Sequence, residues 1–315
     1  MRAVVFDEGD LRVVERPNPE PGPHDVVVAV HAAGLNAADL LQRQGFYPAP
    51  PGWPADVPGL ELAGVVNAVG SEVDVPLLGR RVCAIVGGGA QATHCVVPAE
   101  HLYELPDDVP WNQAGGFAEA FTTAHDALVT QGRLFERERV LVSGASGGVG
   151  TAAVQIAHAL GSHVTAVTRT SEHHEQLRVL GADVTITIEQ LDEIAPVDVL
   201  IELVGAAHLS RAFARLAPRS RVVLIGVGSG SRLEVDLRVI MARRILVTGS
   251  TLRARSREEK SEVIERVRQS LLARWTSGAI HVPVARSFDL DSVTEAYDYF
   301  SRPGKFGKVI LRFEQ

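Results

Sequence analysis

The sequence predicts an α/β protein with two domains, an irregular β domain and a doubly wound parallel sheet. Roughly the first hundred residues form short strand patterns separated by glycine and proline turns. From Arg139 onward, apolar strands alternate with helical segments, as in a parallel sheet buried on both faces. The length of 315 residues suits about two domains.

In the first part of the chain, apolar and alternating runs predict six strands, at Ala3–Phe6, Leu11–Glu15, Asp25–Ala33, Leu60–Gly70, Arg81–Val86 and Ala92–Val97. A short helix is expected between Gly34 and Gly45. The segment 45–58 carries five prolines and must be a long loop, and loops of that length in compact domains are often functional. A helix is predicted over Trp111–Thr130.

The second part predicts six buried strands, at Val140–Ser143, His163–Val167, Val184–Thr187, Val197–Leu203, Arg221–Ile225 and Ile245–Thr248. The tail then predicts helix Glu258–Thr276, strand Val284–Phe288, helix Asp291–Phe300 and strand Lys308–Phe313. The pattern of strands and helices in this tail resembles that of the first domain more than that of the parallel sheet. We therefore expect residues 1–118 and 258–315 to form one domain, and residues 119–257 to form the other.

Composition narrows the classes of protein. The net charge of −7 and the pI near 5.9 argue against a general binder of nucleic-acid phosphates. No apolar run approaches the roughly 20 residues that span a bilayer. The two cysteines cannot form a disulfide framework, and the first residues show no signal-peptide pattern, so a cytoplasmic location is expected.

A glycine-rich turn lies between the strand at Val140–Ser143 and a helical run that starts near Thr151. Read as A-x-G-x-x-G, it is a dinucleotide fingerprint in which Gly147 lets phosphates approach the backbone and Gly150 lets the helix pack closely on the strand. The same letters spell the G-x-S-x-G elbow of serine hydrolases, with Ser146 as nucleophile. A tight turn without a ligand is the third possibility, and the motif alone leaves all three open.

Motifs spread over the whole chain resemble those of the zinc-free medium-chain dehydrogenases/reductases, in the quinone oxidoreductase (zeta-crystallin-like) branch. The matching segments are Leu35–Leu40, Gln42–Tyr47, Gly59–Gly64, Glu119–Ala124, Ala145–Thr151, Gly249–Arg253 and Gly307–Leu311. The resemblance implies a GroES-like catalytic domain, split in sequence around a Rossmann domain. It also implies an NADPH-dependent oxidoreductase that passes hydride to a quinone or a similar conjugated carbonyl.

The resemblance also implies a set of cofactor contacts. They are Thr123, Ala145, Ser146, Gly147, Gly148, Val149, Arg169, Thr170, Ser171, His173, Gly205, Gly226, Gly228, Leu252 and Lys308. The chain departs from the family at His173, where lysine is common, and at Ile188, where tyrosine is common.

The end of the second strand of the parallel sheet predicts which nicotinamide cofactor binds. An NAD site places Asp or Glu there to bind the ribose 2′-OH. This chain instead has Arg169, followed by Thr170 and Ser171. A guanidinium attracts a 2′-phosphate, so NADPH is expected. The alternative is that Arg169 is a solvated residue at a strand end.

Two side chains are candidates for holding the substrate oxygen. Asn36 offers an amide donor, and Tyr47 in the proline-rich loop offers a phenol that can also give a proton. The alternatives are a helix-capping role for Asn36 and a packing role for Tyr47. Glu61, beside the site in the family, is expected to form a salt bridge.

No metal site is expected. Where zinc-dependent relatives have zinc ligands, this chain has Asn36 and Leu60. Quinones and enones delocalise the charge that develops on oxygen, so hydrogen-bond donors can replace the Lewis acid that a simple ketone needs. Cys83 and Cys95, with His94 adjacent, are expected to be buried thiols rather than ligands.

Three other functions stay open. An enoyl or acryloyl-type reductase of activated alkenes would use the same hydride chemistry. A serine hydrolase would need Ser146 with a later acid, Glu202 or Asp198, and a histidine, His208 or His281. A nucleotide-binding protein without catalysis is the third. A homodimer through the apolar sheet edge near Ile245–Leu252 is also expected.

Overall fold

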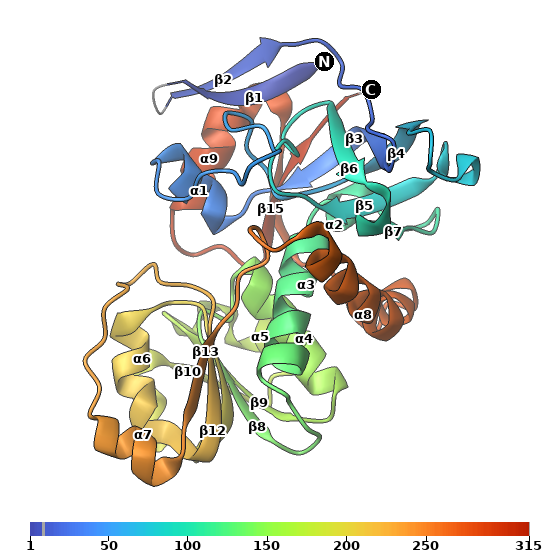
Figure 1. The fold of residues 1–315 in the computed structure, drawn as a ribbon. Coiled ribbons are helices and arrows are strands. Elements are labelled where there is room, and N and C mark those ends of the chain that lie inside the picture. Colours follow the sequence, from blue (N-terminus) through green and yellow to red (C-terminus); the bar gives the residue numbers. More distant parts are fainter. Residues whose placement is uncertain (8–9, 315) are drawn as a thin grey trace. The chain divides into compact units, whose positions relative to one another are not determined.

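A computed structural model describes residues 1–7 and 10–314 of the chain, which divide into two compact units (Figure 1). Unit 1 comprises Met1–Thr122 and Leu252–Gln315, and unit 2 comprises Thr123–Thr251. The junctions between the units therefore fall at 122/123 and 251/252, whereas the sequence predicts them at 118/119 and 257/258. In the described part of the chain, no helix is long and apolar enough to cross a membrane.

Unit 1 is built on a mainly antiparallel seven-stranded sheet in the order β14-β15-β3-β4-β5-β7, with β6 paired to β3. These strands are β3 (Asp25–Gly34), β4 (Glu61–Val69), β5 (Arg81–Ile85), β6 (His94–Pro98), β7 (Leu102–Glu104), β14 (Val284–Asp289) and β15 (Lys308–Arg312). A separate hairpin joins β1 (Arg2–Asp7) to β2 (Asp10–Glu15). The C-terminal strand β15 pairs with β3, so the tail of the chain completes the sheet that the N-terminal segment begins.

The helices of unit 1 are α1 (Ala37–Arg43), α2 (Trp111–Ala114), α3 (Ala118–His125, which runs into unit 2), α8 (Arg257–Thr276) and α9 (Val293–Ser301). Its core is formed by the apolar side chains of β3, β4, β5, β6 and β15, together with α9. Short 3-10 turns complete it at Val75–Leu77, Ala99–His101 and Leu290–Ser292.

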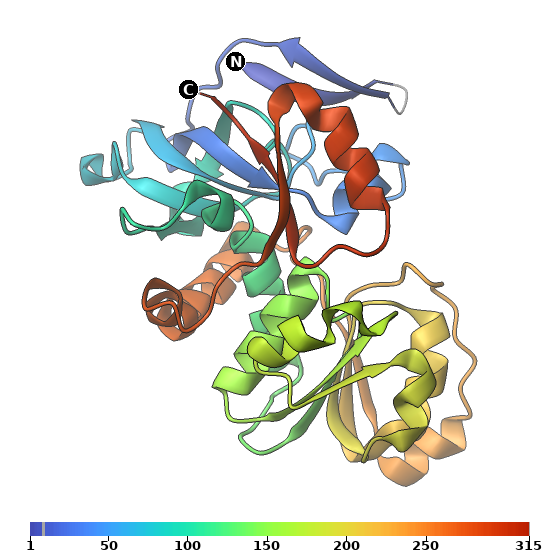
Figure 2. The same ribbon diagram turned by 180° about the vertical axis from the view of Figure 1, so that it is seen from behind.

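Unit 2 contains a six-stranded parallel sheet in the order β10-β9-β8-β11-β12-β13. The strands are β8 (Arg139–Val142), β9 (His163–Thr168), β10 (Val184–Thr187), β11 (Val197–Glu202), β12 (Leu216–Leu224) and β13 (Leu246–Gly249). Helices α4 (Gly148–Ala159) and α5 (His174–Val179) lie on one side of the sheet, and α6 (Ala206–Ala212) and α7 (Leu237–Arg243) on the other (Figures 1 and 2). This is the doubly wound sheet that the apolar strands predict. Short 3-10 turns lie at Ser171–His173, Ile188–Glu193 and Phe213–Arg215.

The predicted helix Trp111–Thr130 is wrong as a single helix. It is divided into α2, α3 and a π-helical turn at Asp126–Gln131. The break falls at Gly115 and Gly116, which pack against other strands. A Cβ on Gly115 would lie 2.7 Å from the Cβ of Ala32 in β3. The helix is therefore interrupted where the chain packs closely against β3. The spacing of apolar residues in the sequence does not show this tertiary contact.

Candidate functional site

The glycine-rich turn of unit 2 connects β8 to α4 at the point where the strand order reverses. Strands β9 and β10 lie on one side of β8, and β11, β12 and β13 lie on the other. In open α/β sheets the crevice at this reversal, at the carboxyl ends of the strands, is where ligands bind. Ala145 is buried, and its N–H donates to the Val167 carbonyl of β9 at 3.0 Å, which anchors the turn.

Two glycines of this turn are glycines for different reasons. A Cβ on Gly150 would lie 2.5 Å from the Gly144 carbonyl oxygen, so internal packing requires its small size. A Cβ on Gly147 would meet nothing closer than 3.5 Å, so packing does not require a glycine there. Ser146 and Gly147 lie directly before α4, Gly148 and Val149 begin its first turn, and all four residues are partly exposed. The open backbone and the helix N-terminus together fit a pyrophosphate.

The end of β9 places its polar residues at the surface. Arg169, Thr170 and Ser171 are exposed, and Arg169 makes no hydrogen bond or ion pair within the described chain. The Thr168 hydroxyl lies 2.9 Å from His174 Nε2 and donates to the Thr170 carbonyl at 2.8 Å, which fixes the turn. The guanidinium is thus free to meet an anion. His173 instead contacts the Gln176 side chain at 2.7 Å through Nδ1.

The turn after β11 is organised by a buried carboxylate. Glu202 Oε1 accepts hydrogen bonds from the N–H groups of Val204 at 2.7 Å and Gly205 at 2.8 Å. Gly205 has a φ of +114°, which side chains rarely adopt, so a glycine is required. Gly226, after β12, packs against the Leu203 backbone, whereas a Cβ on Gly228 would meet only one atom, at 3.9 Å.

Only part of the acid, histidine and serine arrangement that a serine hydrolase needs is present. His208 Nδ1 lies 2.5 Å from Glu202 Oε2, and both side chains are buried. The serine beside this pair is Ser143, which donates to Glu202 Oε1 at 2.9 Å. No hydrogen bond joins Ser146 to a histidine in the described residues, and His208 Nε2 is buried there without a partner. The acid, histidine and nucleophile relay that Ser146 would need is therefore not formed.

In unit 1, the candidate Asn36 lies at the centre of a buried polar network. Its Oδ1 accepts from Lys308 Nζ at 2.7 Å, and its Nδ2 donates to Glu61 Oε1 at 3.0 Å and to the Gly34 carbonyl at 3.3 Å. Lys308 also forms an ion pair with Glu61 at 2.5 Å and donates to the Leu35 carbonyl at 2.9 Å. The three donors of the lysine are thus engaged within unit 1.

Asn36 also caps the helix that follows it. It is the N-cap residue of α1, and its N–H donates to the carboxylate of Asp39 at 2.8 Å. The other Asp39 oxygen accepts from the Gly59 N–H at 3.1 Å. Burial raises the pKa of Asp39 to about 6, against the opposing effect of these hydrogen bonds and of Lys308 and Arg253. Asn36 therefore occupies the N-cap position through its backbone, and its side chain is left to donate to Glu61 and Gly34.

The second candidate, Tyr47, is partly exposed and is held by Arg253. One guanidinium nitrogen donates to the Tyr47 carbonyl at 2.7 Å, a second to Gln42 Oε1 at 2.6 Å, and Nε to the Gly87 carbonyl at 2.8 Å. The guanidinium carbon lies 5.1 Å from the centre of the Tyr47 ring. Arg253 thereby ties the proline-rich loop to α1 and to the segment after β5.

Arg253 and Glu119 are two further residues to which the sequence motifs assign no role. Burial, and then the neighbouring Glu61 carboxylate, raise the pKa of Glu119 to about 8, which keeps it largely protonated at neutral pH. The Glu119 N–H donates to Glu61 Oε2 at 2.9 Å. In the sequence, Glu119 is the one acidic residue within the largely apolar run 114–124, and this position could have indicated a buried carboxyl group.

The remaining predicted contacts lie near the junctions of the units. Thr123 is buried and is the first residue of unit 2, and Leu252 is buried and is the first residue of the second segment of unit 1.

Cys83 and Cys95 are buried free thiols, and burial raises the pKa of Cys95 to about 12. In the described residues, no group of three or more His, Cys, Asp or Glu side chains could hold a metal ion.

Comparison with known proteins identifies the family. Residues 22–131 match the family model described as alcohol dehydrogenase GroES-like domain, and residues 148–269 match zinc-binding dehydrogenase. The quinone oxidoreductase of Homo sapiens is 30% identical over 99% of this chain and 97% of its own length. The chain belongs to the medium-chain dehydrogenase/reductase family. As a member of it, the protein is an oxidoreductase, which confirms the resemblance and the enzyme class inferred from the motifs.

Solved structures of medium-chain dehydrogenases/reductases have the same architecture. The quinone oxidoreductase of Thermus thermophilus, solved also as its NADPH complex, is 30% identical with a TM-score of 0.87, and the match covers 99% of this chain and 100% of that one. A mycobacterial protein complexed with NADPH is 27% identical with a TM-score of 0.87, over 99% and 100% of the two chains. The GroES-like and Rossmann architecture predicted from the sequence is thus confirmed.

Proposed function

We propose that this medium-chain dehydrogenase/reductase uses NADPH to reduce a quinone or a similar conjugated carbonyl, without zinc. The observation that carries the cofactor is Arg169, exposed and without a partner in the described chain, at the strand end where an NAD enzyme has an acid. The relatives named quinone oxidoreductase, one of them solved with NADPH, support the same assignment.

The residues of unit 2 fit this cofactor. Gly147, Gly148 and the first turn of α4 would hold the pyrophosphate, and Arg169, Thr170 and Ser171 would hold the 2′-phosphate. Thr123, Ala145, Ser146, Val149, His173, Gly205, Gly226 and Gly228 complete the proposed contacts in unit 2, and Leu252 is a proposed contact from unit 1. Lys308, whose three donors are engaged within unit 1, is not proposed as a direct contact. Bound NADPH supplies the hydride.

The residues of unit 1 would bind and polarise the acceptor. Tyr47 donates its phenol proton to the substrate oxygen, and Asn36 donates from its amide. Both amide hydrogens of Asn36 have acceptors, so its donation to substrate replaces the longer contact, to the Gly34 carbonyl at 3.3 Å. Lys308 contributes from a distance, because its ammonium orients the Asn36 amide through Oδ1.

A turnover assay tests the proposal. NADPH oxidation would be followed with 1,4-naphthoquinone and, separately, with an α,β-unsaturated thioester. Quinone turnover supports the proposal, whereas turnover of the thioester alone assigns an enoyl-type reductase. NADPH binding without reduction of either acceptor, or labelling of Ser146 by a serine-reactive phosphonate without NADPH binding, would overturn it.

Metal analysis gives an independent test of the zinc-free chemistry. Because Asn36 and Leu60 stand where zinc-dependent relatives have ligands, active protein is expected to contain no stoichiometric zinc by plasma mass spectrometry. Stoichiometric zinc, with loss of activity on chelation, would contradict the proposed roles of Asn36 and Tyr47.

A further inference from the structure

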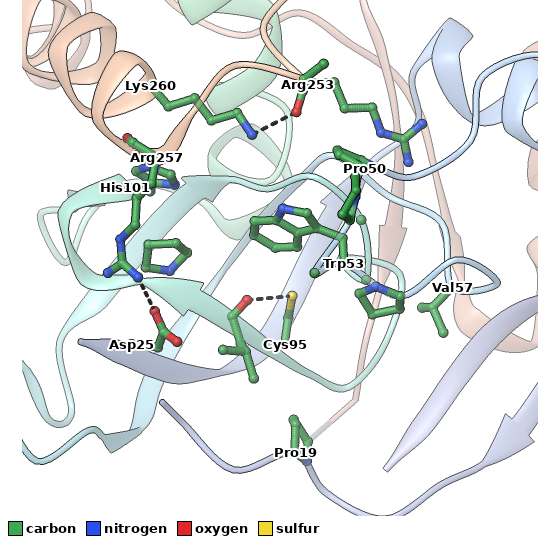
Figure 3. A pocket seen from close by; sticks show the side chains of 18 of the residues that line it. Pro19, Asp25, Pro50, Trp53, Val57, Cys95, His101, Arg253, Arg257 and Lys260 are labelled. Atoms are coloured by element: carbon green, nitrogen blue, oxygen red, sulfur yellow. Dashed lines mark hydrogen bonds and ion pairs between the residues drawn. The ribbon is translucent and has the colours of Figure 1, made fainter. Parts of the chain in front are cut away.

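Unit 1 contains a pocket of about 640 Å³ that does not include Asn36 or Tyr47 (Figure 3). That volume is typical of small-molecule sites. Its apolar walls come from the proline-rich loop and from β6, at Pro50, Trp53, Pro54, Val57 and Val96. A further wall comes from residues 253–256 and from Arg257 and Lys260 in the first turn of α8.

The charged groups in the pocket wall are unbalanced. Four cations line it, Arg253, Arg255, Arg257 and Lys260, and the only carboxylate among the lining residues is Asp25. Asp25 forms an ion pair with Arg257 at 2.9 Å, so it is already neutralised. Arg257 also forms an ion pair with Glu100, so the positive charge that the pocket offers to a ligand comes from Arg253 and Lys260.

Arg253 and Lys260 are the buried members of this group, each 4% exposed. Their hydrogen bonds go to neutral oxygens: Lys260 Nζ donates to the Arg253 carbonyl at 2.9 Å, and Arg253 donates to two carbonyls and an amide. No carboxylate in the described chain lies within ion-pair distance of either group, and Asp39 and Glu119 act on them only at longer range. Burial lowers the pKa of both groups, because the charged form loses its solvation.

Both side chains also have donors to spare. Lys260 uses one of its three N–H groups and Arg253 three of its five. The Lys260 ammonium lies 5.7 Å from the centre of the Trp53 ring. Trp53 is fixed in turn by Gly87, where a Cβ would lie 2.5 Å from the indole. Figure 3 shows Lys260 and Arg253 on the same side of this ring.

We propose that this pocket binds an aromatic carboxylate, with its ring against Trp53 and the prolines and its carboxylate between Lys260 and Arg253. The site is separate from the proposed reduction and requires neither NADPH nor a quinone. The ligand anion would neutralise the two buried cations, and the apolar walls would select a flat ring over an inorganic anion.

Binding of 2-naphthoate to the full chain, without nucleotide, tests the proposal. Titration calorimetry should show saturable binding, and 2-naphthylmethanol, the neutral analogue, should bind at least tenfold more weakly. Lys260→Met should weaken naphthoate binding at least tenfold, and Lys260→Arg should retain it. Binding should also change the tryptophan fluorescence of the protein. Trp53→Phe should remove that change, since the chain's other tryptophans, Trp111 and Trp275, do not line the pocket.

Lys305→Met is the matched control. Lys305 also donates to a carbonyl, that of Arg302 at 2.6 Å, and lies 4.9 Å from the Phe300 ring, but it does not line the pocket. Its variant should bind naphthoate like the wild type. Equal binding of the neutral analogue, undiminished binding by folded Lys260→Met, or no saturation would each overturn the proposal. If Lys260→Met does not fold, the comparison of the two ligands on the wild type decides.

Discussion

Lys308 shows how one buried cation organises several residues that chemistry would use. It joins the Glu61 carboxylate and the Asn36 amide, and Asn36 in turn caps α1 and contacts Asp39. A buried pair of this kind is strongly destabilising to break, because removal of one partner leaves the other charge uncompensated.

Asp39 should make the stability of the protein depend on pH. Its folded pKa, about 6, lies above the ordinary value of 3.8, so the folded state holds the proton more tightly than the unfolded state. Its contribution is therefore fully present below the unfolded pKa and is lost as pH rises through the folded pKa. The free energy of unfolding of wild type minus that of Asp39→Asn should fall by about 3 kcal/mol between about pH 3 and about pH 7. Urea unfolding at several pH values measures it, and a flat or rising difference would contradict the prediction.

Tyr47→Phe should lower kcat with the quinone by on the order of 100-fold, because the phenol donates to the substrate oxygen in the transition state. NADPH affinity should be unchanged, since the ring and its contact with Arg253 are kept. Steady-state kinetics with fluorescence titration of NADPH separate the two effects. Wild-type turnover by the variant would leave Tyr47 a packing role only.

Arg169→Glu should reverse the cofactor preference. Loss of a charge-assisted bond to the 2′-phosphate costs about 1.5–3 kcal/mol, so the ratio of kcat/KM for NADPH over NADH should fall by roughly 10- to 100-fold. Arg139→Glu, an exposed change of the same charge at the opposite end of the sheet, is the control. An unchanged ratio in Arg169→Glu would remove this residue from the phosphate site.

At the scale of elements, the turn between β8 and α4 combines two requirements in one short segment. One glycine lets the helix pack on the strand, and another leaves the backbone open toward solvent. The same distinction applies after β12, where Gly226 is packed and Gly228 is open. Glycines that look equivalent in the sequence therefore differ in the structure: some are required by close packing, and others leave room where a cofactor is proposed to bind.

Alanine substitutions should separate these demands. Gly150→Ala should lower the free energy of unfolding by about 1–3 kcal/mol, because its Cβ would lie 2.5 Å from the Gly144 carbonyl oxygen. Gly147→Ala should change stability little but weaken NADPH binding about tenfold, since the methyl group would occupy the proposed phosphate face. Thermal unfolding and NADPH titration of both variants measure this. Equal effects of the two substitutions on binding would argue against the proposed phosphate position.

At the scale of the whole molecule, the six-stranded sheet ends in an open edge. Strand β13 pairs only with β12 among the described residues, and Leu246 and Val247 on it are 50% and 41% exposed. On the neighbouring helix α7, Leu237 and Met241 are also exposed. An apolar open edge of this kind is a surface for pairing with another strand, which supports the proposed homodimer near Ile245–Leu252.

Leu246→Lys should therefore convert the protein to a monomer of 33.8 kDa, whereas the wild type should sediment with twice that mass. Leu78→Lys is the matched control, because Leu78 is 51% exposed in unit 1. Sedimentation velocity over a range of concentrations measures both. A wild type that is monomeric throughout, or a dimeric Leu246→Lys variant, would exclude this edge.

The sequence by itself determined the elements that depend on local pattern. Apolar strands buried on both faces identify the parallel sheet, the glycine spacing locates the turn before α4, and an arginine instead of an acid follows β9. Motifs in order along the chain also indicated the family. These properties can be predicted from the sequence because each follows from the spacing of residues near one another in the chain.

Only the tertiary structure decided which distant residues meet. Lys308 and Asn36 are 272 positions apart, and their pairing depends on β15 lying beside β3. Contacts between residues that are distant in the sequence also form the pocket beside Trp53 and the hydrogen bond from Arg253 to the Tyr47 carbonyl. Such contacts bury Asp39 and thereby raise its pKa. Burial and counter-ions are properties of three-dimensional surroundings, so no local pattern records them.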